Sequence, residues 1–398
     1  APFDASNIEG GSGDCGGNSG IIFTAPQTLY YKHTGGGTTH LGDATKWFSD
    51  QEKTIQGRIP LPQDTAIFDE GSFDTDCTLN LSLLRICTLD LRSVNRQITV
   101  TTNTTQFYGN ILNNSLTKFT SATSISLNLN GAGNFFLDFQ NGLNKNINIS
   151  CNRGDYTSLS GFAAGAVAIQ SGGTLRLGDY DYTLEALTVK DNPWRGYLCF
   201  GLGLITIKGF WDYCFHKQGG GIMYNTETSN ILFDPPASPN NFIVNFANQT
   251  FGKVTFAGIH TGAFIIPNWT RFNELVIHSG RKIRVWTGIT LYINKLIALS
   301  SPEEPAEITS TTEGQHTLSF TGEGKVAADY LNLSYSKALP ENTWYAGMNS
   351  IDGGNNTGWI FDNAPIRYMK ISGSQATWND PATWSLWAGG PTSYPAPT

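Results

Sequence analysis

Two pairs of carboxylates are the residues of this sequence best suited to hydrolytic chemistry. Asp179 and Asp181 are separated by one residue, and Glu303 and Glu304 are adjacent. A glycosidase or lyase on a β-helix would need two carboxylates about 5–9.5 Å apart across a groove, and alternate residues of a strand share one face. The stretch 178–182 is also typical of a surface turn with solvated acids. This second interpretation is favoured, so we predict no catalytic residue and no enzymatic activity.

The histidines and cysteines lack the spacing of metal ligands. The six His show no short metal-binding spacing, and the six Cys contain no C-x-x-C pair. The oxygen-rich stretch 352–356 could hold Ca²⁺, but it lacks the EF-hand spacing and a bidentate Glu, and a tight turn is favoured. Cys77 with Cys87, and Cys199 with Cys214, are close enough in sequence to form disulfides, although buried free thiols are favoured. We therefore expect no metal and no cofactor.

Aromatic side chains that lie close together in sequence are the candidate binding residues. Exposed aromatic rings can stack on sugar rings and often mark a partner surface. The alternative is that these rings pack inside the fold. The residues predicted to contact a glycan or a partner are Trp194, Trp211, Tyr213, Tyr180 and Tyr182.

The overall composition excludes several classes of partner. Charged residues make up 14% of the 398 residues, the net charge is -7, and there is no basic run. Such a surface argues against nucleic-acid binding and against binding to anionic membranes. No stretch approaches 18 consecutive apolar residues, so we expect no membrane insertion. Aromatic residues, at 12%, are sufficient to build a core.

The pattern of apolar residues predicts an all-β fold. Short apolar or alternating runs, such as 263–266 and 290–293, recur about every 8 to 12 residues between Gly, Asn, Asp or Pro. The one helical candidate is a short turn within 161–169, which two glycines weaken. Most breaks are single Gly or Asn residues rather than hairpin signals. The sequence therefore favours a β-helix-like solenoid with rungs of about 20 residues or more and smaller β caps at its ends, over β-sandwich modules.

A repeated motif links the two ends of the chain. Asp43 recurs as Asp380 and Trp47 as Trp384, both at an offset of 337 residues, and Pro60 matches Pro395 at an offset of 335. The chain thus reads as one module followed by the opening of another. Either it belongs to a tandem protein, or another chain completes the second copy in a head-to-tail assembly. The residues predicted to take part in assembly are Trp47, Pro60, Pro62, Trp378, Trp384, Pro395 and Pro397.

These observations divide the chain into four regions. Residues 1–29 form a Gly/Ser-rich linker or assembly segment, and residues 30–74 carry the opening Trp/Pro motif and a cap. Residues 75–365 form the solenoid body, and 366–398 form the start of a second module or an inter-subunit contact.

The motifs at both ends of the module resemble those of known proteins. Trp47, Pro60, Pro62 and Asp64, with the closing stretches 344–347 and 352–361, resemble the modular β-rich virion proteins of tailed bacteriophages. Tail-fibre and adsorption-type proteins, and related large bacterial surface proteins, share this pattern. The stretch 378–385 is also similar to the start of a module found in secreted proteins.

The resemblance implies a non-enzymatic structural protein located outside the cell or in a virion. Its expected partners are further copies of itself in a fibre or homo-oligomer, other virion proteins, or a cell-surface glycan. Two alternatives remain at this stage. One is a polysaccharide lyase or glycosidase on a β-helix, and the other is a glycan-binding bacterial adhesin.

Overall fold

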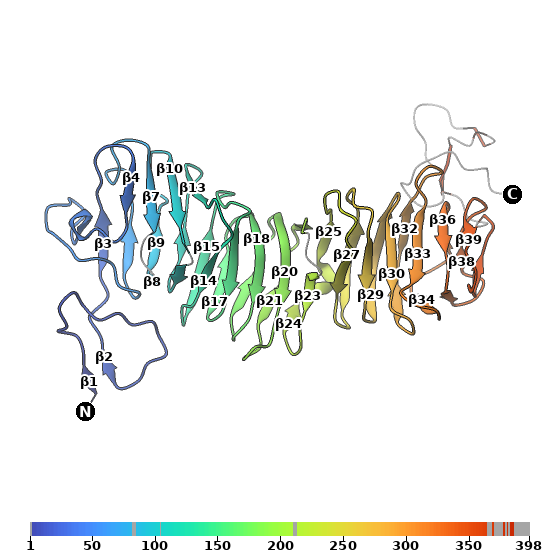
Figure 1. The fold of residues 1–398 in the computed structure, drawn as a ribbon, viewed down its shortest axis with the longest axis horizontal. Helices are drawn as coiled ribbons and strands as arrows, with labels where there is room; N and C mark the ends of the chain where they lie inside the picture. The colour runs from blue at the N-terminus through green and yellow to red at the C-terminus, as the bar shows by residue number, and fades with distance from the viewer. Residues whose placement is uncertain are drawn as a thin grey trace. The chain divides into compact units, whose positions relative to one another are not determined.

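The chain folds almost entirely into short parallel β-strands. The computed structural model describes residues 2–81, 85–103, 105–209, 213–363, 368–369, 377–378, 380 and 383–385. The named helical elements among these residues are two short 3₁₀ turns, η1 (Ala44–Lys46) and η2 (Thr226–Thr228). The strands stack as successive rungs of a β-solenoid (Figure 1). The predicted fold class is therefore confirmed.

The chain divides into two compact units. Unit 1 comprises Ala1–Thr206 and Lys217–Asn225, and unit 2 comprises Ile207–His216 and Thr226–Thr398. The boundaries between the units fall inside two strands, β22 (Leu204–Ile207) and β23 (Tyr213–Lys217). Both units contain buried apolar side chains.

Unit 1 is built from three stacks of strands. The ten-stranded sheet contains β3 (Thr28–Tyr31), β5 (Trp47–Phe48), β6 (Thr65–Ile67), β9 (Thr88–Asp90), β12 (Ile111–Leu112), β15 (Asn134–Asp138), β17 (Asp155–Ser158), β19 (Thr174–Arg176), β21 (Tyr197–Cys199) and β24 (Ile222–Tyr224). The four-stranded sheet contains β4 (Thr38–His40), β7 (Cys77–Leu81), β10 (Ile98–Thr102) and β13 (Thr117–Thr120). The third stack contains β8 (Arg85–Ile86), β11 (Thr105–Phe107), β14 (Ile125–Leu129), β16 (Ile147–Cys151), β18 (Phe162–Ile169) and β20 (Tyr182–Val189). A separate parallel pair joins β1 (Phe3–Asp4) to β2 (Ile21–Ile22).

Unit 2 continues the same type of stacking. Its main stack contains β25 (Asn230–Phe233), β26 (Phe242–Asn245), β27 (Thr250–Phe256), β28 (Ala263–Ile266), β29 (Thr270–His278), β30 (Lys282–Val285), β31 (Thr290–Ile293), β32 (Leu296–Leu299), β33 (Ala306–Ser310), β34 (His316–Phe320), β36 (Leu331–Leu333), β37 (Ser336–Leu339) and β39 (Ile351–Asp352). A three-stranded sheet contains β35 (Val326–Ala327), β38 (Trp344–Tyr345) and β40 (Trp359–Ile360). The last described strands are β41 (Tyr368–Met369) and β42 (Trp384–Ser385).

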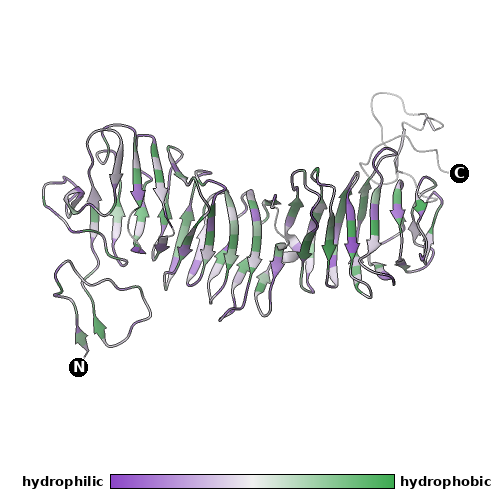
Figure 2. Cartoon of the chain, in the orientation of Figure 1, coloured by the Kyte–Doolittle hydropathy of each residue, from purple (hydrophilic) through white to green (hydrophobic). Residues whose placement is uncertain are grey.

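The core forms because the strands stack in register. In unit 1, five fully buried side chains from successive rungs lie in one row: Leu29, Ala66, Leu89, Ile111 and Leu137. In longer strands such as β7, β14 and β16, buried positions alternate with half-buried ones, and green and purple segments alternate along the strands in Figure 2. No rung could bury its apolar face alone, so each rung is stabilised by its neighbours.

Unit 2 uses more aromatic residues for the same purpose. Phe251, Phe272 and Ile293 are fully buried and stack in register on three successive rungs. Within the same part of the unit, Phe264 of one rung pairs with Ile283 of the next. The distance in sequence between such partners is close to the rung length that the pattern of apolar residues predicts.

Residues 162–169 form strand β18 and not the short helical turn that the sequence allowed within 161–169. Ala166 and Ala168 of β18 pair with β20, and the backbone N–H of Ala166 donates to the Asn148 side chain at 2.7 Å. A Cβ at Gly165 would collide with that same Asn148 amide oxygen. The small residues therefore permit a close approach between rungs, which the sequence shows only as low side-chain volume.

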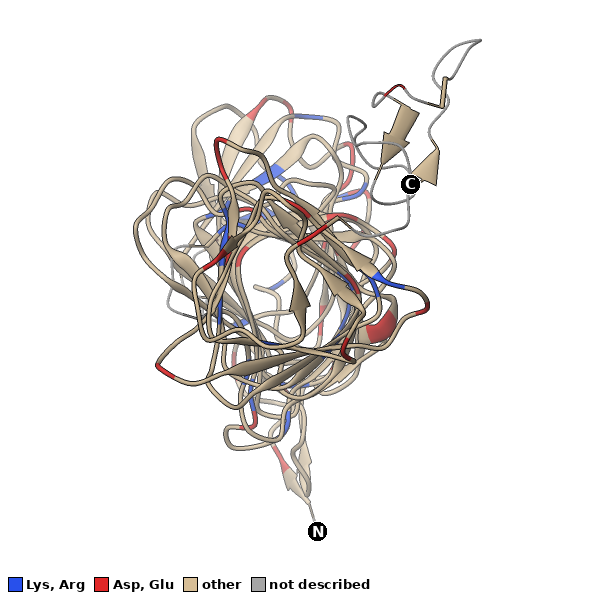
Figure 3. Cartoon of the chain, turned by 90° about the vertical axis from the view of Figure 1, so that its right-hand side faces the viewer, with Lys and Arg blue, Asp and Glu red and all other residues tan. Residues whose placement is uncertain are grey.

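Charged residues are sparse along the strands and of both signs, as Figure 3 shows. Several link neighbouring rungs on the outer surface. Arg176 bonds Asp155 at 2.6 Å in unit 1, and in unit 2 Glu274 is held by Lys253 at 3.2 Å and by Lys295 at 2.9 Å. These exposed pairs add little stability individually, so apolar stacking is the main stabilising interaction.

Truncating one residue of a stack should weaken the solenoid measurably. Ile149 is fully buried between Leu127 and Val167, so Ile149→Ala should lower the free energy of unfolding by about 2–5 kcal/mol. The neighbouring Ser150 faces outward, and Ser150→Ala should change it by less than about 0.5 kcal/mol. Denaturant titrations followed by circular dichroism would measure both values, and equal effects of the two substitutions would contradict the stacked core.

All six cysteines are free in the structure, including the two pairs considered for disulfides. Burial raises the pKa of Cys87 and of Cys214 to about 12. These thiols should therefore react with a thiol reagent only after unfolding, and a reductant should leave the melting temperature unchanged. A lower melting temperature in reductant, or a protein mass smaller by two protons per bridge, would show disulfides instead.

Candidate functional site

The opening Trp/Pro motif forms an aromatic cap on the first rungs of unit 1. The fully buried Trp47 meets Tyr31 edge-on with 4.9 Å between ring centroids, and it meets Phe68 at 5.7 Å. Its indole N–H donates to the Leu41 carbonyl at 2.8 Å. Trp47 begins β5, the terminal strand of the ten-stranded sheet, which pairs antiparallel with β3. Trp47 therefore closes the core of its own chain, and its predicted role in assembly stays a prediction.

Asp64 explains the spacing of the Pro-rich part of this motif. Its buried carboxylate forms an ion pair with Arg58 and accepts hydrogen bonds from the backbone N–H groups of Leu61, at 2.6 Å, and Gln27, at 2.8 Å. Two segments of chain, one at Gln27 and one at 58–64, converge on this carboxylate, which holds the two neighbouring buried prolines, Pro60 and Pro62, in place. An assembly role for these prolines is not tested by this arrangement.

The Gly/Ser-rich N-terminal segment packs on this cap. The Gln63 side-chain amide donates to the carbonyl groups of Ser12, at 3.0 Å, and Thr24, at 2.9 Å, and accepts from the Asp14 N–H at 2.8 Å. Arg153 donates to the Gly16 carbonyl at 3.1 Å. A sequence too poor in apolar residues to form its own core is thus ordered by hydrogen bonds to the same chain.

The second copy of the motif repeats the hydrogen bonds of the first. The Trp384 indole N–H donates to the Trp378 carbonyl at 2.6 Å, and that of Trp47 donates to a carbonyl equally far upstream. The Thr383 N–H donates to the Asp380 carbonyl, which matches the bond from Lys46 to Asp43 in the first copy.

The strand pairs agree with this match. Among the strand pairs whose register is described, β3–β5 and β41–β42 are the antiparallel ones. The repeat is therefore structural as well as sequential. Pro395 and Pro397 lie outside the described residues.

The predicted aromatic contact residues differ in exposure. Trp194 is 71% exposed and Tyr180 is 43% exposed, so both are accessible. Tyr182 is buried, where its ring packs edge-on against Phe162 at 5.0 Å and its hydroxyl accepts from the Gly178 N–H. Trp211 and the side chain of Tyr213 lie outside the described residues.

The candidate carboxylates make structural hydrogen bonds. Asp179 accepts from the Leu202 N–H at 2.8 Å, and Asp181 accepts from the Leu204 N–H at 2.9 Å, so each carboxylate joins its rung to the next. The stretch 352–356 is a turn in which Asp352 accepts from Gly354 and Asn356. The described residues contain no group of three or more His, Cys, Asp or Glu that could hold a metal ion.

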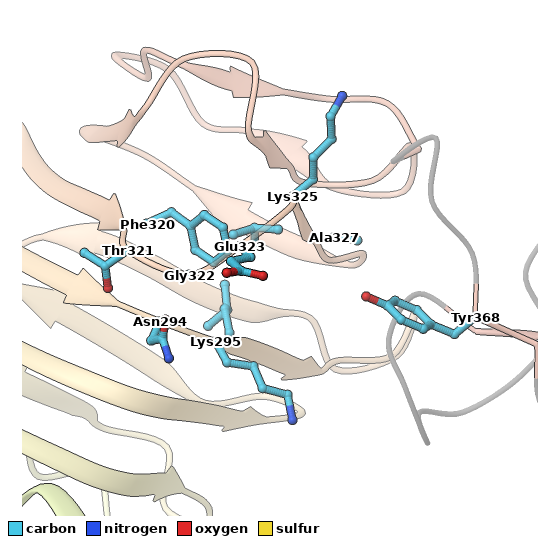
Figure 4. A pocket seen from close by; sticks show the side chains of 11 residues that line it. Asn294, Lys295, Phe320, Thr321, Gly322, Glu323, Lys325, Ala327 and Tyr368 are labelled. Atoms are coloured by element: carbon cyan, nitrogen blue, oxygen red, sulfur yellow. The ribbon is translucent and has the colours of Figure 1, made fainter.

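An open cleft of about 540 Å³ lies on unit 2 (Figure 4). Its charged lining residues are Lys295, Glu323 and Lys325, and the Tyr368 hydroxyl points into it. Among the described lining residues Glu323 is the single carboxylate, whereas glycoside hydrolysis usually needs two. This arrangement suits binding of a polar ligand better than hydrolysis.

A second surface site was missed in the sequence. Trp269, Arg271 and Tyr292 line a shallow cleft of about 400 Å³ on unit 2. Trp269 and Tyr292 are so far apart in the sequence that no local motif contains both. The period of one rung, which separates the register partners Arg271 and Tyr292, is the signal that could have found them.

Two buried histidines should make stability depend on pH. Burial lowers the pKa of His316 to about 4, and burial together with the nearby Arg281 charge lowers that of His260 to about 4. The unfolded chain, with ordinary histidine pKa values near 6.5, binds more protons between about pH 6.5 and pH 4. The free energy of unfolding should therefore be unaffected above pH 6.5 and fall as the pH drops through this range, by up to about 3 kcal/mol for His316.

The variant His316→Gln should reduce this slope, whereas Ser150→Ala, which removes no titratable group, should leave it unchanged. Denaturant unfolding at pH 4 to 8 would measure both slopes. A stability that rises as the pH falls would contradict a neutral, buried His316.

Comparison with known proteins yields no relative. The chain matches no protein-family model, no curated protein and no solved structure. In the described part of the chain, no helix is long and apolar enough to span a bilayer. The resemblance to modular virion proteins thus remains an expectation from the motif residues.

Proposed function

We propose that the chain is a non-enzymatic extracellular structural protein, a β-solenoid module of a virion or surface fibre that provides rigidity, assembly or host attachment. The observation that carries this proposal is the repeated capping motif. Trp47 and Trp384 make the same hydrogen bond and occupy the same kind of antiparallel strand pair. The first copy of the motif caps a stack of strands, and a second copy occurs near the other end of the chain. A tandem or head-to-tail series of modules requires such a repeated cap.

The stacking within each unit supports a mechanical role. Every rung is tied to the next by parallel backbone hydrogen bonds and by rows of buried side chains. Bending such a stack would separate residues that are in contact on one side, and densely packed interiors resist this. The stacked fold therefore supports the proposal that the chain provides rigidity.

The use of the candidate carboxylates supports the non-enzymatic part of the proposal. Asp179 and Asp181 each accept a backbone N–H of the following rung. A catalytic pair would have to face a common substrate atom across a groove. A polysaccharide lyase or glycosidase is therefore the weaker candidate.

A glycan-binding adhesin is the second candidate. The observation that favours it is the cleft with Trp269, Arg271 and Tyr292 on the outer surface of unit 2. Host attachment by a fibre and adhesion by a surface protein would both use such a site.

Electron microscopy would test the proposal. The purified chain should form periodic fibres at high concentration, and a variant ending at residue 365, which lacks the second motif copy, should form fewer. Gold-labelled antibodies against the chain should decorate virions or cell surfaces in the source culture. The proposal would be refuted if the chain stays monomeric or degrades polysaccharides in a substrate panel. It would also be refuted if the antibodies label neither virions nor cell surfaces.

A further inference from the structure

We infer that unit 2 carries a binding site for an anionic oligosaccharide, formed by Trp269, Arg271 and Tyr292. The inference deepens the proposed function and rests on it, because a protein that attaches to a cell surface would encounter saccharides there. The site is distinct from the aromatic residues that the sequence indicated.

The register of the strands places these three side chains together. Arg271 of β29 pairs directly with Tyr292 of β31, and the residues on either side of each, such as Thr270 and Leu291, point into the core. Arg271 and Tyr292 therefore face outward side by side on neighbouring rungs. Trp269 is two residues before Arg271 and is 43% exposed on the same side of the strand.

The aromatic rings form a corner rather than a flat patch. Trp269 and Tyr292 lie at 86° to each other with 6.3 Å between ring centroids. The cleft between them is shallow, and its remaining lining residues are Gly288, Ile289 and Thr290. A pyranose ring presents a C–H face that can pack on one aromatic ring, while its hydroxyl groups can reach the polar groups at the rim.

The charge of the site indicates an anionic sugar. The Arg271 guanidinium carbon lies 5.1 Å from the centroid of the Tyr292 ring, and among the described residues no carboxylate forms an ion pair with it. The acid three positions along the strand, Glu274, is already held by Lys253 and Lys295. The side chains of Arg271, Lys253 and Lys295 are positive and that of Glu274 is negative, so together they carry a net charge of +2. A guanidinium fixed on an aromatic ring is well suited to a carboxylate or a sulfate group.

The chain contains a matched control for the aromatic part of the site. Phe136 is 47% exposed, and it lies in unit 1 without a ring contact among the described residues and outside every predicted binding site. Its replacement removes an exposed aromatic surface from the chain. It therefore separates specific stacking at Trp269 from general loss of exposed aromatic area.

Calorimetric titration of the purified chain would test the inference. Hexagalacturonic acid presents carboxylates, a chondroitin sulfate hexasaccharide presents sulfates as well as carboxylates, and maltohexaose is the neutral control. We expect binding of one or both anionic probes and none of maltohexaose, and we expect binding to weaken as salt is raised. If only the chondroitin sulfate probe binds, sulfate is the group recognised.

The variants give the site-specific result. Trp269→Ala and Arg271→Gln should each weaken binding about tenfold or more. Arg271→Lys should retain part of the affinity, and Phe136→Ala should retain all of it. Unchanged melting temperatures would show that the variants remain folded.

Binding of neither anionic probe, equal binding of maltohexaose, or binding unaffected by both Trp269→Ala and Arg271→Gln would overturn the inference. The titration does not depend on fibre formation. A chain that binds the saccharide but never assembles would refute the proposed fibre and leave the site intact. A chain that assembles into fibres but binds no saccharide would refute the binding site and leave the proposed fibre intact.

Discussion

In-register parallel stacking is the constraint on which the rest of the structure depends. A rung of three short strands has too little apolar surface to fold alone, so every inward residue must find its counterpart on the rungs beside it. The row from Leu29 to Leu137 in unit 1 satisfies this requirement with aliphatic side chains. The same register also sets the outer surface, because it brings Arg271 against Tyr292 and Glu274 between two lysines. The register between strands therefore determines both the rows of buried side chains and the groups of side chains on the outer surface.

A parallel stack also leaves strand edges exposed, which the chain manages in a specific way. At the start of unit 1 the antiparallel strand β5 covers the edge of β3, and Trp47 fills the space beneath it. Asp64 then holds the segments on either side together through Arg58 and two backbone N–H groups. Covered edges resist unwanted pairing with other chains, so this motif also protects the edge of the sheet that it covers.

The sequence predicts the fold better than it predicts the sites, for a physical reason. Short apolar or alternating runs are a local property, and they locate strands such as Ala263–Ile266 and Thr290–Ile293 at their observed bounds. Which face an aromatic residue occupies depends on where the strand begins, so Tyr180 and the buried Tyr182 could not be told apart. The Trp269 cluster depends on the register between rungs, which is not a local property. The sequence likewise left open whether Asp179 and Asp181 are catalytic or structural. Their hydrogen-bond partners, the N–H groups of Leu202 and Leu204, lie one rung away and are not visible in the local sequence.

The rungs are unequal in length, and this has a consequence for how such a chain can change over time. In unit 2 Phe264 pairs with Ile283, whereas Thr290 pairs with Thr317, which is further along the sequence, although both pairs are in register. The extra residues of the longer rung include the exposed corner segments around 302–304 and 312–313. Insertions at corners therefore leave the pairing intact, because loop closure costs little per added residue. New loops could be gained there one at a time, so that surface specificity diversifies while the interior is inherited unchanged.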